Sequence, residues 1–124
     1  MKVFIMQLIF LTSVVAYAGE WIAVDGGSIK IDLNEQKVEY SLWEFLATKK
    51  TYKFLPKENY TYQYQANVKN GKEEVYINAF CKERKSLNLH KDFVVVLDGG
   101  SCYFHIKYNS ETGKFYNLNV NGEA

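Results

Sequence analysis

The sequence predicts an α+β domain, in which one helix packs on an antiparallel β-sheet and a single disulfide joins two strands. Three observations support this prediction: alternating apolar residues on both sides of short turn sequences, one segment with helical spacing, and an isolated pair of cysteines. Aromatic residues, which pack well on sheets, make up 16% of the chain. We expect a β-hairpin, a helix and a four-stranded meander, with an all-β fold as the alternative.

Residues 1–18 have the pattern of a secretory signal peptide. A lysine precedes an apolar run, and the run ends at Ala16-Tyr17-Ala18, a small-x-small cleavage site. We expect cleavage before Gly19, which leaves residues 19–124 as a single domain in the periplasm or in the medium. The apolar run is too short for a good membrane span, so no span is expected after cleavage.

The charge of the predicted mature chain is balanced. Removing residues 1–18 takes away one of the 15 basic residues, so that 14 basic and 14 acidic residues remain. A neutral domain has no strong electrostatic attraction to nucleic acid or to anionic lipid. We therefore expect no nucleic-acid partner for this chain.

The first predicted element is a hairpin over residues 22–31. Apolar residues alternate on both sides of the turn sequence Asp25-Gly26-Gly27-Ser28. A Gly-Gly pair can take positive φ at both turn positions, as a two-residue hairpin requires. A turn at Gly26-Gly27 would place Ile22 opposite Ile31, so that apolar residues meet on one face.

The next element is a helix, predicted from Leu33 to Lys49. Asp32 and Glu35 have the spacing of a capping box, and the apolar residues that follow recur at helical intervals. The same segment also allows a strand through Trp43 and Phe45, and the sequence leaves that alternative open. The segment after it, which contains the only proline, is expected to be a loop.

The strongest hairpin signal is the dipeptide Asn70-Gly71. Tyr60 to Val68 alternates aromatic or apolar residues with polar ones, and Val75 to Cys81 does the same beyond the turn. A two-residue turn at this dipeptide pairs Ala66 with Val75. The whole apolar set of both strands then lies on one face of the sheet.

A third hairpin is predicted in the C-terminal part of the chain. Phe93 to Leu97 is a continuous apolar run, typical of a strand that is covered on both faces. Asp98-Gly99-Gly100-Ser101 repeats the earlier turn sequence and predicts a hairpin with the residues that follow. A last turn at Asn109 to Gly113 would return the chain and place Val120 opposite Cys102.

Cys81 and Cys102 are the only cysteines. In an exported protein an isolated pair is best explained as a disulfide, which here closes a loop of about 20 residues and contributes on the order of 3 kcal/mol. The polar segment Lys82 to Asp92 is expected to be the connecting loop. No metal site is expected, because the only other soft ligands are two histidines without a repeated spacing.

One predicted surface has the composition of a protein interface. The outward faces of the second and third hairpins combine tyrosines and amides with few charges, as interfaces do. We expect this face to bind another protein, unless the N-terminal hairpin or a second copy of the chain covers it. Its candidate residues are Gln63, Gln65, Tyr76, Asn78, Phe80, Tyr103 and His105.

No complete catalytic constellation is present in the sequence. Ser28 and Ser101 follow Gly-Gly pairs inside predicted tight turns, and the cysteines are better used in a disulfide. His90 and His105 have no partner that the sequence identifies. We therefore expect no enzymatic activity and no cofactor.

These observations predict an exported, non-catalytic protein-binding domain. An inhibitor or immunity protein that acts on an envelope hydrolase is its most concrete form, and a homodimer is compatible with it. A small-molecule carrier or a structural envelope protein is the alternative. A carrier predicts an apolar cavity between helix and sheet, whereas an inhibitor predicts a filled core.

Three strings carry a resemblance to other proteins: Val75 to Cys81 (VYINAFC), Asp98 to Phe104 (DGGSCYF) and Val120 to Ala124 (VNGEA). They resemble a group of small, exported, uncharacterised bacterial proteins with paired cysteines and a DGGSCYF hairpin. The resemblance implies a bacterial source and an envelope location, and it implies no activity. The helix-then-meander order is also similar to cystatin architecture, but the Gln-Val-x-Ala-Gly loop of cystatins has no counterpart, so protease inhibition is not implied.

Overall fold

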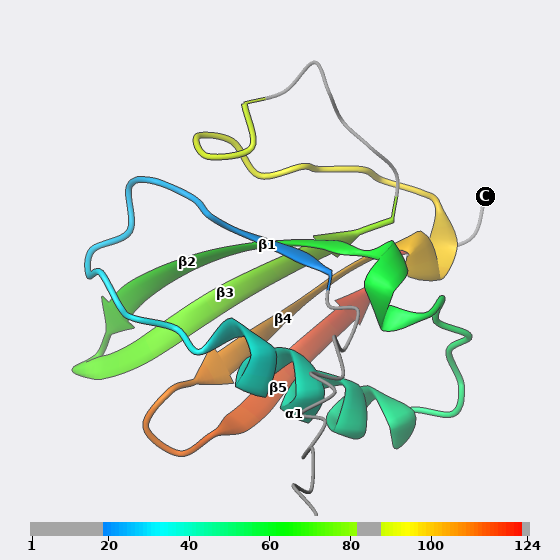
Figure 1. Ribbon diagram of the computed structural model, residues 1–124, viewed down its shortest axis with the longest axis horizontal. Helices are drawn as coiled ribbons and strands as arrows, with labels where there is room; N and C mark the ends of the chain where they lie inside the picture. The colour runs from blue at the N-terminus through cyan, green and yellow to red at the C-terminus, as the bar shows by residue number, and fades with distance from the viewer. Residues whose placement is uncertain (1–18, 82–87, 123–124) are drawn as a thin grey trace, which may run out of the picture.

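The structure of the protein is a computed structural model, and it describes residues 19–81 and 88–122. One five-stranded sheet carries one helix across one of its faces (Figure 1). This arrangement confirms the expected α+β class. The predicted signal peptide, residues 1–18, lies outside the described residues.

The strands follow one another across the sheet in the order of the sequence. They are β1 (Glu20–Ala23), β2 (Thr61–Lys69), β3 (Lys72–Phe80), β4 (Tyr103–Asn109) and β5 (Lys114–Val120), and the helix is α1 (Glu35–Ala47). Strands β2 to β5 are antiparallel neighbours and form a four-stranded meander, in which the predicted strand Phe93 to Leu97 has no place. Strand β1 joins the edge of β2 in parallel, so the sheet has five strands and is mixed.

The β2–β3 hairpin has the predicted turn and register. Ala66 lies opposite Val75, and Tyr64 lies opposite Ile77. The turn residues Asn70 and Gly71 have φ values of 53° and 75°. Asparagine and glycine are the residues that tolerate this left-handed conformation best, which explains why so local a signal predicts the turn correctly.

The core lies between α1 and the inner face of the sheet. Val38, Leu42 and Leu46 line the buried side of the helix and pack against apolar side chains of β2, β3 and β4, including Ile77 and Ile106. Each of these five side chains is almost fully buried. Burying one such side chain contributes about 1.5–3 kcal/mol, so this contact determines where the helix lies on the sheet.

The helix begins two residues later than the capping-box pattern predicts. Asn34 is the N-cap, and its Oδ1 accepts the Lys37 N–H at 3.2 Å. Asp32 and Glu35 therefore do not form the expected capping box. The strand alternative for residues 33–49 is wrong, because helical spacing is what brings the apolar residues onto one buried face.

The predicted N-terminal hairpin is absent from the described structure. The Val24 N–H donates to the Tyr64 carbonyl at 2.8 Å, and the Ile29 N–H donates to the Ala66 carbonyl at 3.4 Å. Both sides of the Gly26-Gly27 segment therefore bond to the edge of β2 and not to each other. After β1 the chain leaves the edge of β2, passes through an irregular loop and then contacts β2 again (Figure 1).

The third hairpin is also different from the prediction. Phe93 to Leu97 is not a strand, and β4 pairs with β3 instead, with Ile106 opposite Ile77. Gly99 and Gly100 have φ values of 109° and 58°, and they lead into a 3-10 turn at Gly100–Cys102. The Gly-Gly pair thus turns the chain into β4 without a partner strand on its N-terminal side.

The predicted disulfide is present and joins the ends of β3 and β4. Cys81 follows β3 and Cys102 precedes β4, with their Cα atoms 5.0 Å apart. The Cys81 N–H also donates to the Cys102 carbonyl at 3.0 Å. The bridge closes a loop whose described part is residues 88–101. Residues 88–97 of this loop cross the outer face of the sheet, and we call these residues the strap.

The register of β5 is shifted by a β-bulge. Val120 lies opposite Phe104 and not opposite Cys102 as the alternation predicts. The irregularity falls between His105 and Lys107, and Asn117 has a φ of 54°. The displacement from the predicted register is two residues: one arises at the turn, where Tyr108 lies opposite Phe115 rather than Lys114, and the bulge adds the second.

Candidate functional site

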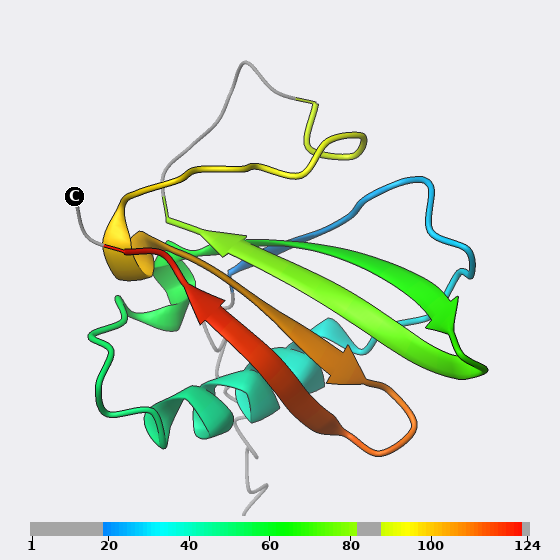
Figure 2. The same ribbon diagram turned by 180° about the vertical axis from the view of Figure 1, so that it is seen from behind.

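The strap and α1 lie on opposite faces of the sheet. Figure 2 shows the strap (yellow) running above the sheet while the helix lies below it. The strap therefore covers the face that the sequence marks as a candidate interface. How it is held there decides which of the predicted residues can reach a partner.

Gln63 of β2 is the main support beneath the strap. Its Nε2 donates to the Leu89 carbonyl at 2.9 Å and to the Asp92 carbonyl at 2.7 Å. Its Oε1 accepts the Val94 N–H at 2.9 Å and Asn78 Nδ2 at 3.2 Å. Both donor hydrogens and both acceptor positions of this fully buried amide are used.

Two asparagines hold the next part of the strap. Asn78 Nδ2 donates to the Val94 carbonyl at 2.9 Å. Asn121 Nδ2 donates to the Val96 carbonyl and, at 3.1 Å, to the Asp98 carbonyl. The side-chain amides thus take the place of a neighbouring strand and bind the inward-facing backbone groups of the strap.

A small second core anchors the strap to the sheet. Val94 points inward and packs with Phe80 of β3 and Tyr103 of β4, and all three side chains are buried. Together with Gln63 and Asn78, these residues lie beneath the strap. This part of the predicted contact face is therefore covered. The segment that covers it is the strap, and not the N-terminal hairpin or the second copy of the chain that the sequence analysis considered.

The other three predicted residues, Gln65, Tyr76 and His105, are partly exposed to solvent. Tyr76 lies between Phe93 of the strap and His105, with ring centroids 5.0 Å and 5.4 Å apart. Burial raises the pKa of Tyr76 and lowers the pKa of His105, and Lys107 lowers the latter further. Gln65 donates to the Asp25 carbonyl at 2.8 Å, which ties β2 to the N-terminal loop.

The outer side of the strap presents apolar side chains to solvent. Val94 is 5% exposed, whereas Val95 is 80% exposed and Leu97 is 88% exposed. This alternation is that of an extended chain with one face buried. Within the described part of the chain, the N–H and C=O of Val95 make no hydrogen bond, so one backbone unit is also open to a partner.

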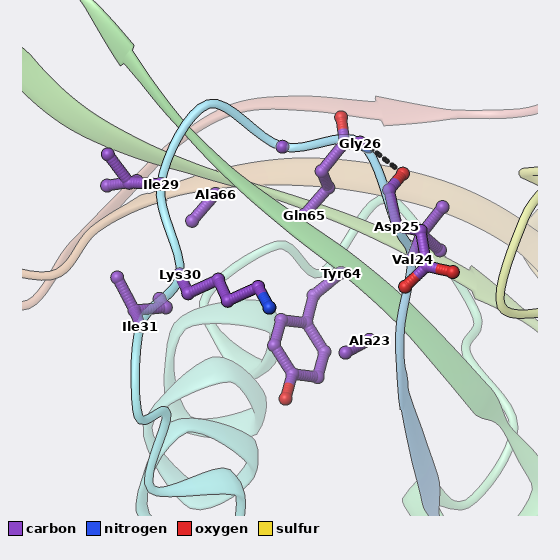
Figure 3. Close-up of a pocket in the computed structure, with 11 residues that line it drawn as sticks. Ala23, Val24, Asp25, Gly26, Ile29, Lys30, Ile31, Tyr64, Gln65 and Ala66 are labelled. Carbon is purple, nitrogen blue, oxygen red and sulfur yellow. Dashed lines mark hydrogen bonds between the residues drawn. The ribbon is translucent and has the colours of Figure 1, made fainter.

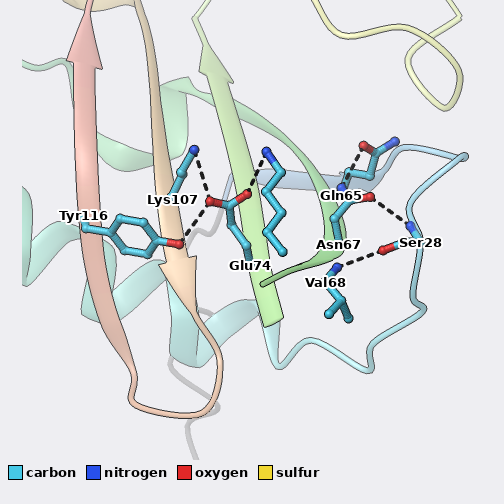
Figure 4. A network of polar contacts seen from close by, with 8 residues as sticks. Ser28, Gln65, Asn67, Val68, Glu74, Lys107 and Tyr116 are labelled. Carbon is cyan, nitrogen blue, oxygen red and sulfur yellow. Dashed lines mark hydrogen bonds and ion pairs between the residues drawn. The ribbon is translucent and has the colours of Figure 1, made fainter. Parts of the chain in front are cut away.

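A polar cluster on the same side of the sheet ties four strands together, β2 to β5. Glu74 Oε2 lies 3.3 Å from Lys69 Nζ, and Glu74 Oε1 lies 3.1 Å from Lys107 Nζ (Figure 4). Tyr116 donates from its hydroxyl to Glu74 at 3.2 Å. Burial acts to raise the pKa of Glu74, but the bonds from Lys107, Lys69 and Tyr116 outweigh it, so the pKa is lowered.

The N-terminal loop is fastened to the end of β2 by Ser28. The Ser28 N–H donates to Asn67 Oδ1 at 2.9 Å, and the Ser28 hydroxyl accepts the Val68 N–H at 2.8 Å (Figure 4). These bonds give Ser28 a structural role. Ser28 lies in an irregular loop and not in the tight hairpin turn that the sequence predicted.

The loop and β2 enclose an open pocket of about 450 Å³. Lys30 extends into it towards the ring of Tyr64, while Ile29 and Ile31 form an apolar side (Figure 3). The Tyr64 hydroxyl donates to Glu35 Oε1 at 3.3 Å, outside the lining of the pocket. The lining thus combines apolar surface with the Lys30 ammonium group, the Asp25 carboxylate and the polar side chains of Tyr64 and Gln65.

Two further observations apply to residues 19–81 and 88–122. No helix in these ranges is long and apolar enough to cross a membrane. Nowhere in them do three His, Cys, Asp or Glu side chains gather to hold a metal ion. His90 is exposed, and its Nδ1 lies 3.2 Å from the Ala23 carbonyl.

Comparisons with protein-family models, with curated proteins and with solved structures found no match. The resemblance to small exported bacterial proteins with paired cysteines therefore stays a prediction.

Proposed function

We propose that this chain is an exported, non-catalytic domain that binds another protein through the outer side of the strap. The most concrete form of this function is that of an inhibitor or immunity protein for an envelope hydrolase. The observation that carries the proposal is the almost complete exposure of Val95 and Leu97 on a segment that is held from beneath. Large apolar side chains that remain in solvent on an ordered segment are typical of contact surfaces.

The way the strap is held supports a binding role. The disulfide closes the loop at its base, while Gln63, Asn78 and Asn121 bind the strap from below. A segment that is already ordered loses little conformational entropy on binding. An extended segment with an open backbone unit also suits docking into a cleft or pairing with a strand of the partner.

The exported location is supported by two features of the chain. The disulfide is of the kind that persists in oxidising compartments. The pattern of residues 1–18 is that of a cleavable signal peptide, and we propose cleavage before Gly19. The periplasm or the medium is the expected location of the mature protein.

The carrier alternative finds less support in the core. Leu42, Ile77 and Ile106 have no exposed surface, and they fill the space between helix and sheet where a carrier would hold its ligand. The pocket in Figure 3 lies at the edge of the sheet and is open to solvent. No observation favours a structural envelope protein over a binding domain.

The test is capture of a partner from envelope extract with the purified mature protein. A captured hydrolase should lose activity at a one-to-one ratio of the two proteins. Val95→Asp with Leu97→Asp should weaken capture at least tenfold and leave the melting temperature nearly unchanged, because both side chains lie in solvent.

Val68→Asp is the matched control, since Val68 is an exposed valine on the far end of the β2–β3 hairpin. It should leave capture unchanged. Equal capture by the double variant and wild type would refute the strap as the contact surface. A captured partner whose activity is unaffected would refute the inhibitor form of the proposal.

A further inference from the structure

The side chain of Glu39 is a buried carboxylate near the beginning of the described chain. Glu39 lies on α1 and is only 3% exposed. Its Oε1 accepts the backbone N–H of Gly19 at 2.8 Å. Removing a carboxylate from water is costly unless a positive charge or several hydrogen-bond donors compensate for the lost hydration.

The donors that face Glu39 compensate its burial only in part. Burial raises the pKa of Glu39, while the Gly19 N–H, Trp21, Lys57 and Tyr62 act to lower it without cancelling the rise. Lys57 acts from beyond ion-pair distance, because no ion pair joins it to Glu39. Within the described part of the chain, the buried Trp21 Nε1 has no hydrogen-bond partner.

The hydroxyl of Tyr62 is already engaged elsewhere. It donates to the Lys57 carbonyl at 2.9 Å and accepts from Trp43 Nε1 at 2.8 Å. The backbone N–H of Gly19 thus donates the one well-formed hydrogen bond that Glu39 receives, and the Trp21 indole and the Tyr62 hydroxyl add weaker stabilisation from nearby. These neutral donors leave the buried carboxylate without a positive charge in contact.

Position 19 itself is built to accept only glycine. A Cβ there would lie 2.4 Å from the Tyr60 carbonyl oxygen and 2.5 Å from Tyr62 Cε2. It would also lie 3.1 Å from the Lys57 carbonyl oxygen. The backbone of Gly19 therefore sits in a close-fitting site bordered by two carbonyl acceptors and the Glu39 carboxylate.

We propose that Glu39 is the binding site for the α-ammonium group that cleavage before Gly19 creates. The inference rests on the cleavage step of the proposed function. Hydrolysis of the Ala18–Gly19 peptide bond by a signal peptidase consumes one water and yields a carboxylate on Ala18 and an ammonium group on Gly19. The nitrogen that offers one neutral N–H in the uncut chain then offers three donors and a positive charge.

The new N-terminus forms a buried ion pair with Glu39 and gives this carboxylate the positive charge it lacks. It joins the first residue of the mature chain to α1, across the edge of the sheet where β1 begins. The stability of the fold is thereby coupled to processing. The uncut chain keeps an undercompensated buried carboxylate, and the cut chain does not.

The experiment compares two chains that differ by one residue. One begins with a free amine at Gly19, and the other begins at Ala18, so that position 19 carries an amide. The helix and all five strands lie within residues 19–122, so both chains contain the whole fold. The Gly19 chain should have a folding equilibrium constant at least tenfold larger at pH 7, as urea unfolding would show.

Glu39→Gln should abolish the difference between the two chains, whereas Glu20→Gln, on an exposed side chain of β1, should preserve it. If the Glu39 variant does not fold, NMR titration of the wild-type amine decides: its pKa should lie above the ordinary value of about 7.7–8.0. The stability advantage should then disappear as the pH rises through that raised pKa.

Two results would overturn the inference, and they are distinguishable. Mass spectrometry of the exported protein would refute the cleavage step if the mature chain begins at another residue. Equal stability of the two chains, together with an ordinary amine pKa, would refute the ion pair even where cleavage before Gly19 is established.

Discussion

Replacing Gln63 by leucine tests whether one buried amide holds the strap. The substitution keeps the approximate volume of the side chain and removes its four hydrogen bonds. The carbonyls of Leu89 and Asp92 lie in the less buried part of the strap, where water can replace the lost donor. The Val94 N–H and the Asn78 amide are buried and lose a partner that water cannot easily replace.

The expected cost follows from those two buried groups. A buried polar group that loses its partner costs about 1–3 kcal/mol, and the new leucine recovers a part of this by burying apolar surface. We expect Gln63→Leu to lower the free energy of unfolding by about 2–4 kcal/mol. For a domain of about 100 residues this corresponds to a melting temperature lower by roughly 10–30 °C.

The assay is urea unfolding, combined with hydrogen exchange at the Val94 amide. Exchange at Val94 should become much faster in the variant, because its acceptor is Gln63 Oε1. Gln65→Leu is the matched control: it lies two residues further along β2, is half-exposed, and makes a single contact to the Asp25 carbonyl and one to Asn67. If Gln63→Leu costs less than about 1 kcal/mol, or no more than the control, the strap is not held in this way.

Two further predictions concern the disulfide and pH. Replacing Cys81 and Cys102 by alanine should lower the free energy of unfolding by about 2–5 kcal/mol in a denaturant titration, because the bridge closes a long loop; a change below about 1 kcal/mol would contradict this. Burial, followed by Lys107, lowers the pKa of His105 in the folded chain below its ordinary value of 6.5, so the unfolded chain binds the proton more readily. Stability should therefore decrease as the pH falls through about 6.5, and His105→Asn should reduce this slope, whereas an unchanged slope would show that another group is responsible.

The parts of the fold that could be predicted are those with a local cause. The β2–β3 register follows from Asn70-Gly71, because positive φ at two adjacent residues is a property of those residues themselves. The helix follows from its apolar spacing, although its first residue does not, since Asn34 and Asp32 are both acceptable caps. The disulfide follows from the composition, because the chain contains two cysteines and no others.

The same reasoning fails where a distant segment competes for the same groups. Gly26-Gly27 has the local signal of a hairpin, but the free edge of β2 offers carbonyls to both of its flanks. Phe93 to Leu97 has the composition of a covered strand, but β4 takes the edge of β3 that the run would need. The pattern of residues within one segment carries no information about such competition from another segment.

The candidate site, too, could be predicted from the sequence only in part. The sequence identified an amide-rich and tyrosine-rich face, and seven residues of that face were predicted as a contact surface. The tertiary structure decided that Gln63 and Asn78 support the strap, and that Val95 and Leu97 lie in solvent. No sequence signal distinguishes an amide that binds a partner from one that binds its own chain, because both require only unused donors and acceptors.

What the sequence by itself determined is therefore a set of local structures: one helix, one hairpin with its register, and one disulfide pair. What only the tertiary structure decided is which segment covers which face, and that Glu39 on the helix meets the nitrogen of Gly19, 20 residues before it. Local structure depends on the conformational preferences of adjacent residues. Long-range contacts depend on which of several compatible partners buries the most apolar surface and satisfies the most polar groups, and that can be compared only in the folded chain.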